Sequence, residues 1–117
     1  MGAGLRDISD KEIKTAVINL TAGGAEDEDA IALVAGKKLE IVDMFLVVSA
    51  SVSIGFKTAV PTESGTALTG LMSLAVKSVY APGYNPDSHF ATLAGQNLEI
   101  ACGGATDIDG WINYYEV

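Results

Sequence analysis

Residues 39–58, LEIVDMFLVVSASVSIGFKT, constrain the fold more than any other part of the chain. Residues 41–48 are apolar at every position except Asp43, which predicts a strand that is covered on both faces. Residues 52–57 alternate apolar with small or polar side chains, a pattern typical of a half-buried strand. We expect the two halves to be antiparallel neighbours, joined by a tight turn near Ala50 and packed in the core.

Length and composition predict one folded domain. The chain has 117 residues, of which 49% are hydrophobic and 19% charged, so it can bury a core and is not disordered. We expect residues 12–117 to form this domain and residues 1–11 to form an N-terminal arm. A net charge of −8 argues against binding to nucleic acid or to an anionic membrane. The single cysteine, Cys102, excludes an internal disulfide, and neither a signal peptide nor a membrane span is recognisable.

Turn residues divide the rest of the chain into short apolar segments. Expected strands cover residues 12–20, 30–35, 89–93, 98–102 and 108–117, and Gly110 in the last one predicts a bulge or a close backbone approach. Residues 66–80 fit either a helical stripe or two short strands, at 67–71 and 75–80. We favour the strands because Gly70 weakens a helix and every other expected element is a strand. The pattern predicts an all-β fold, an antiparallel β-sandwich or jelly roll of about eight strands.

The residues Glu26, Asp27, Glu28 and Asp29 form a run of four carboxylates. Clustered oxygens could bind a hard cation. However, the run lacks the spacing of a calcium-binding loop, and successive side chains on a strand point to opposite faces. We therefore favour a solvated hairpin tip.

No residues have the spacing of a catalytic, cofactor or metal site. His89 is the only histidine, which excludes a site with several histidine ligands, and we expect it to be a hydrogen-bonded loop residue. Cys102 alternates with apolar neighbours and should be a small buried hydrophobe. Asp107 and Asp109 share a strand face, but nothing indicates the cleft that an acid–base pair needs. We expect a structural or interaction protein with no cofactor, and not an enzyme.

Several motifs resemble those of small virion proteins of tailed bacteriophages. The resemblance covers residues 31–117. It includes AGKKLEIV at 35–42, VSIGFKT at 52–58, GTALTG at 65–70, a proline-bearing loop followed by Phe90, LAGQNLEI at 93–100 and the aromatic end at 111–117.

This resemblance implies a head decoration (cement) protein, made in the host cytoplasm and placed on the capsid surface of the virion. Its partners would be the major capsid protein and other copies of itself, in a homotrimer. The alternative is a tail, collar or fibre module that binds a receptor or carbohydrate. A small jelly-roll hydrolase is a third hypothesis, from a different class.

For the interface we predict the arm, the loop at 81–88 and the aromatic end of the chain. The predicted interface residues are Leu5, Arg6, Ile8, Tyr80, Tyr84, Phe90, Trp111, Tyr114 and Tyr115.

Overall fold

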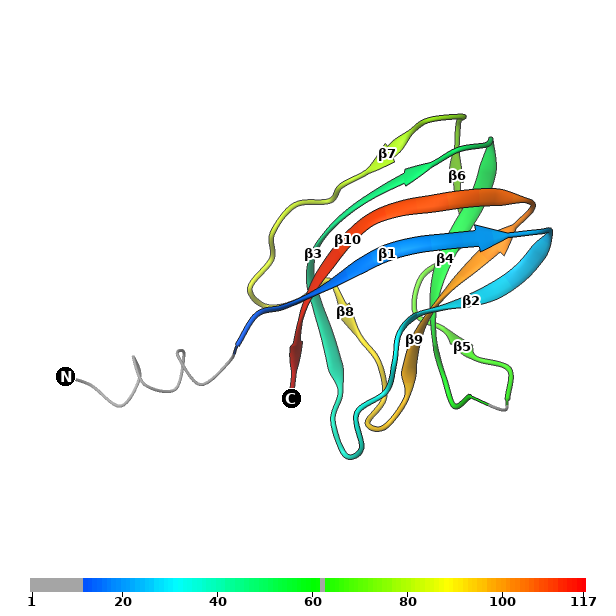
Figure 1. Cartoon of the computed structure of the whole chain (residues 1–117). Helices are drawn as coiled ribbons and strands as arrows, with labels where there is room; N and C mark the ends of the chain where they lie inside the picture. Colours follow the sequence, from blue (N-terminus) through cyan, green and yellow to red (C-terminus); the bar gives the residue numbers. More distant parts are fainter. Residues whose placement is uncertain (1–11, 62) are drawn as a thin grey trace.

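A computed structural model describes residues 12–61 and 63–117 (Figure 1). Within these residues the protein is all-β, as predicted, with ten strands and no helix. Six strands are long and four have only two or three residues. The strands are β1 (Lys14–Ala22), β2 (Ala25–Ile31), β3 (Leu39–Val48), β4 (Val52–Ala59), β5 (Thr66–Ala67), β6 (Met72–Leu74), β7 (Val79–Tyr80), β8 (Phe90–Ala91), β9 (Asn97–Gly103) and β10 (Thr106–Glu116).

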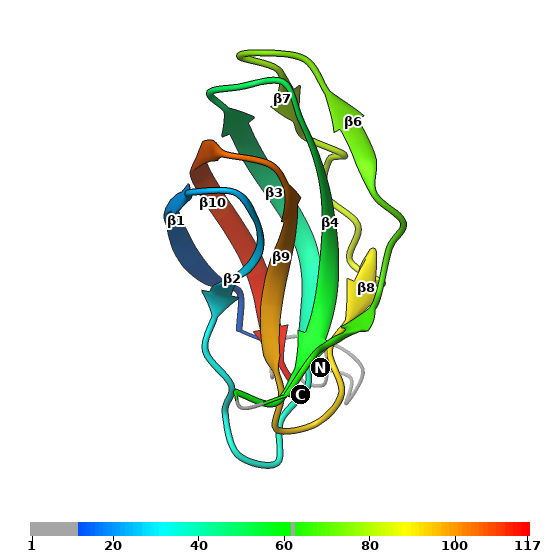
Figure 2. The ribbon, with the colours of Figure 1, turned by 90° about the vertical axis from the view of Figure 1, so that its right-hand side faces the viewer.

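Two antiparallel sheets of five strands pack against each other as a β-sandwich (Figures 1 and 2). The first sheet has the order β1-β10-β3-β7, and β8 also pairs with β3. The second sheet has the order β2-β9-β4-β5, and β6 also pairs with β4. The pairing is nested: β1 pairs with β10, β2 with β9, β3 with β7 and β8, and β4 with β5 and β6. The first and last strands therefore lie side by side in the first sheet.

The predicted hairpin at residues 39–58 is wrong. Its halves are strands, β3 and β4, but they belong to different sheets and do not pair with each other. Residues 49–51 carry the chain from one layer to the other (Figure 2). The physical reason is that β3 and β4 each have an apolar face, and these faces exclude water best when they lie opposite each other in the core.

The alternation predicted for residues 52–57 is confirmed, because Val52, Ile54 and Phe56 lie in the core. The two-sided cover predicted for residues 41–48 is only partly right. Val42 is fully buried, but Phe45, on the face of β3 away from the core, remains 39% exposed.

Three further segments differ from the prediction. The four carboxylates lie inside β2 rather than at a hairpin tip, and the turn falls at residues 23–24. Residues 32–38 contain no strand, so the strand expected at 30–35 is wrong beyond Ile31. Residues 66–80 form strands and no helix, as we favoured, but they contain the three short strands β5, β6 and β7 instead of two strands at 67–71 and 75–80.

Both inner faces contribute to one continuous core. Its fully buried large side chains include Phe56, Leu39, Ile41, Met44, Leu46, Ile54, Leu98, Ile100, Ile108 and Ile112. Gly110 lies in the middle of the first sheet, opposite Ile18 on β1 and Leu46 on β3. Its φ angle is 143°, and a Cβ atom there would collide with the carbonyl oxygen of Phe45. The predicted close backbone approach at Gly110 is confirmed.

We expect Gly110→Ala to lower the free energy of unfolding by more than about 3 kcal/mol, because it adds both a steric clash and backbone strain. Urea unfolding followed by circular dichroism measures this change. The matched control is Gly104→Ala, where a Cβ atom meets nothing within 4 Å. Equal midpoints for the two variants would contradict the expectation.

Candidate functional site: the outer face of the first sheet

Three apolar side chains form a row across the outer face of the first sheet. Val17 on β1 is opposite Trp111 on β10, and Trp111 is opposite Phe45 on β3. Their sequence neighbours Ile18 and Ile112 lie in the core, so alternation directs the row outward. We call Val17, Trp111 and Phe45 the apolar row.

Within the apolar row, Phe45 and Trp111 are in ring contact, Val17 and Phe45 are exposed, and Trp111 is half-buried. The rings of Phe45 and Trp111 are stacked, with centroids 6.3 Å apart and an interplanar angle of 17°. Val17 is 82% exposed and Phe45 39% exposed. Single exposed apolar residues are common on protein surfaces, whereas contiguous ones mark interaction surfaces. The row is therefore a candidate interface.

The rows on either side of the apolar row contain carboxylates. On one side Asp109 is opposite Val47, and Val47 is opposite Val79. Val79 lies at the sheet edge and is 50% exposed. On the other side Asp43 is opposite Asn113. Neither flanking row contains a lysine or arginine within the described strands. This surface thus offers apolar contact area with a negatively charged border.

The predicted aromatic end of the chain is divided between the two faces. Trp111 belongs to the apolar row, whereas Tyr114 packs against the core, and burial raises the pKa of its hydroxyl. Tyr115 is 7% exposed, and its hydroxyl lies 3.2 Å from that of Tyr84. This hydrogen bond, followed by burial, raises the pKa of Tyr115. It also ties the loop between β7 and β8 to β10.

The other predicted interface residues do not gather with the apolar row. Tyr80 and Phe90 pack on Phe56, with ring centroids 6.3 Å and 5.0 Å away. Tyr84 is 55% exposed in its loop. The remaining predicted residues, Leu5, Arg6 and Ile8, lie outside the described residues.

Sequence reasoning missed Val17, Phe45 and Val79. Val17 and Ile18 are adjacent apolar residues in the strand expected at 12–20, and adjacent residues on a strand face opposite ways. The signal was the pair itself: only one of two neighbouring apolar residues can enter the core, so the other is a candidate for the surface.

The carboxylates of β2 alternate between the two faces of the second sheet. Glu26 and Glu28 are opposite Cys102 and Ile100, which lie in the core, and so belong to the inner face. Burial, followed by the charge of Glu26, raises the pKa of Glu28. Within residues 12–61 and 63–117, no cluster of three or more His, Cys, Asp or Glu side chains could hold a metal ion. The structure gives the cation hypothesis no support.

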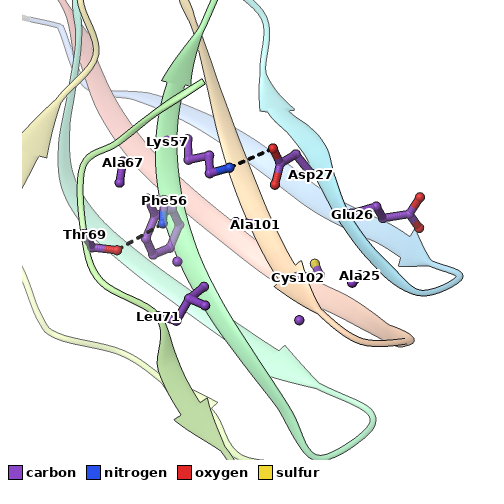
Figure 3. Close-up of a pocket in the computed structure, with 12 residues that line it drawn as sticks. Ala25, Glu26, Asp27, Phe56, Lys57, Ala67, Thr69, Leu71, Ala101 and Cys102 are labelled. Atoms are coloured by element: carbon purple, nitrogen blue, oxygen red, sulfur yellow. Dashed lines mark hydrogen bonds and ion pairs between the residues drawn. The ribbon is translucent and has the colours of Figure 1, made fainter. Parts of the chain in front are cut away.

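A hollow of about 490 Å³ lies on the outer face of the second sheet (Figure 3). Its floor includes the small residues Gly55 and Ala101. The ion pair between Lys57 and Asp27, 3.0 Å long, crosses one side. The segment at 67–71 forms another side, where the hydroxyl oxygen of Thr69 accepts a hydrogen bond from the backbone N–H of Phe56. The hollow could receive a small apolar group.

The two candidate reactive side chains have structural roles. Cys102 is buried in the core, as predicted, and burial raises the pKa of its thiol to about 11, so it stays protonated at neutral pH. The Nε2 atom of His89 lies 2.7 Å from the backbone oxygen of Gly83, which confirms the predicted hydrogen-bonded loop residue.

Comparison of the chain with protein-family models, curated proteins and solved structures gives no match. None of the described residues form a helix that could cross a membrane. The fold places the protein in the class of all-β sandwiches.

Glu28 makes the stability of the protein depend on pH. A raised pKa in the folded state means that the folded protein binds the proton more tightly than the unfolded chain, so stability falls as the pH rises through the pKa of Glu28. We expect Glu28→Gln to raise Tm at pH 7 by about 1–3 °C, the effect of a few tenths of a kcal/mol. The gain should vanish near about pH 4, where the carboxyl is largely protonated in both states.

Thermal unfolding at the two pH values measures this difference. Glu63→Gln, in the exposed loop after β4, is the control and should leave Tm unchanged. A destabilised Glu28→Gln protein at pH 7 would contradict the argument.

Proposed function

We propose that this protein is a structural virion protein of a tailed bacteriophage, a head decoration (cement) protein that binds and stabilises the capsid. It is made in the host cytoplasm and joins the capsid surface, where its partners are the major capsid protein and other copies of itself in a homotrimer. This role needs no enzyme activity, cofactor, nucleic acid or membrane. The motif resemblance of residues 31–117 to small phage virion proteins supports it.

We also propose that the sandwich is a jelly roll of eight strands. The count follows if β5 and β6, which both pair with β4, are one interrupted strand. The same holds for β7 and β8, which both pair with β3. Nested pairing of the first strand with the last, and so on inward, supports this topology. Jelly rolls are a recurrent architecture of viral capsid proteins.

One observation supports the function best, namely the apolar row on the outer face of the first sheet. Trp and Phe in contact, with a less apolar border, have the composition of the centre of a protein interface. Because the row lies on three paired long strands, it is held rigidly, and binding it would cost little ordering of the backbone. Such a surface suits a protein that reinforces a lattice.

The test is binding to expanded capsids of the encoding phage that lack their decoration protein. We expect the protein to co-sediment with these capsids and to raise their melting temperature. Trp111→Ala should weaken capsid binding by about tenfold or more, because it removes the central side chain of the apolar row. Leu71→Ala is the control, since Leu71 is 64% exposed but lies beside the hollow of the second sheet.

Urea unfolding of both variants would verify that they fold. A wild-type protein that ignores capsids would overturn the proposed function. Capsid binding that is unchanged by Trp111→Ala would exclude the apolar row as the capsid contact.

The second candidate is a tail, collar or fibre module that binds carbohydrate. Its support is the exposed ring of Tyr84, since aromatic rings are common contacts for ligands. Tyr80 and Phe90, the nearest aromatic residues in sequence, pack on Phe56 instead. Glycan binding that is lost in Tyr84→Ala would favour this candidate over the capsid role.

A further inference from the structure

The first sheet ends in a long open edge at β1. Within residues 12–61 and 63–117, β1 pairs only with β10, and no loop backbone hydrogen-bonds to its other edge. The register with β10 runs without a break from Lys14 to Ala22. Between Thr15 and Ala22 there is no charged residue and no proline. Alternate backbone N–H and C=O groups of a flat edge strand are free to pair with another strand.

The other sheet edges carry features that prevent such pairing. β2 has four successive carboxylates, and its register shifts between Asp29 and Ile31. The edges opposite β1 and β2 consist of strands of two or three residues. Charges, irregular register and short length all discourage the addition of a strand. Among the described strands, β1 is the long edge that has an unbroken register and, from Thr15 to Ala22, no charged residue.

The surroundings of β1 determine which strand would fit. An added strand continues the first sheet, so its outward side chains would lie beside Val17 and extend the apolar row. Its inward side chains would point toward the second sheet, on the side of the sandwich where β1 and β2 are the edge strands (Figures 1 and 2). Glu26 and Glu28 of β2 belong to the inner face on that side. Positive side chains would therefore be favoured there.

A second copy of this chain fits the edge poorly. Pairing of β1 with β1 of another copy would bring a second acidic β2 to the same side of the sandwich. The copies also carry a net charge of −8 each. A strand from a different protein, with lysine or arginine at alternate positions, meets the acidic β2 with charge of the opposite sign.

We propose that the free edge of β1 accepts one strand of a protein partner, with apolar side chains beside Val17 and lysine or arginine beside Glu26 and Glu28. Main-chain hydrogen bonds supply affinity in this mode of recognition, and the alternating side chains supply specificity. The proposal rests on the proposed function, since it names the kind of segment that a capsid partner would offer. The lysine or arginine of the partner strand would also relieve the repulsion between Glu28 and Glu26.

The probe is a blocked nine-residue peptide in which lysine alternates with valine, titrated into the full chain at low ionic strength. We expect saturable binding by calorimetry, with slower hydrogen exchange at the backbone amides of β1. A peptide with glutamate in place of lysine should not bind, and one with a central proline should bind weakly because it cannot complete the ladder. Glu26→Gln combined with Glu28→Gln should weaken binding about fivefold or more, whereas Glu63→Gln should not.

Four outcomes would overturn the proposal. They are equal binding of the lysine and glutamate peptides, binding without protection of β1, binding only after removal of residues 1–11, and protection of β1 that grows with protein concentration alone. The third outcome would assign the edge to the N-terminal segment and the fourth to a second copy. Capsid binding is measured separately, so loss of peptide binding with capsid binding intact overturns this inference and leaves the proposed function standing.

Discussion

The structure depends on the contact between the inner faces of the two sheets. Each long strand has one apolar face, and water is excluded from these faces only when the sheets pack together. Phe56, Ile54 and Leu46 are fully buried in this contact, and each such side chain contributes about 1.5–3 kcal/mol of transfer free energy. Since β3 and β4 lie in opposite layers, the contact also dictates where the chain must cross from one sheet to the other.

Once the inner faces are committed to the core, the outer faces and the edges are free to differ. The first sheet has the stacked pair Phe45 and Trp111 on its outside, whereas the second has the small residues Gly55 and Ala101. The edges differ as well. β2 has successive carboxylates, and burial, followed by the charge of Glu26, raises the pKa of Glu28. β1 is the exception, because it has no charged residue from Thr15 to Ala22, and this side of the sandwich is therefore asymmetric.

The candidate site was only partly predictable from the sequence. Trp111 was predicted because a large aromatic residue near the end of a strand is conspicuous. Val17 and Phe45 were not, because their exposure depends on which of two adjacent apolar residues enters the core. That choice requires the register of β1, β10 and β3, which pairs residues from both ends of the chain. The same uncertainty explains why Tyr80 and Phe90 could not be placed against Phe56 from sequence.

The sequence by itself determined the all-β class, the alternation at residues 52–57 and the buried character of Cys102, since these follow from side-chain periodicity and turn residues within a few positions. Only the tertiary structure decided the partners of each strand. A short turn such as residues 49–51 can close a hairpin or lead into the opposite layer, and local chemistry does not distinguish the two. The difference lies in the burial of apolar faces contributed by distant strands, which no local pattern contains.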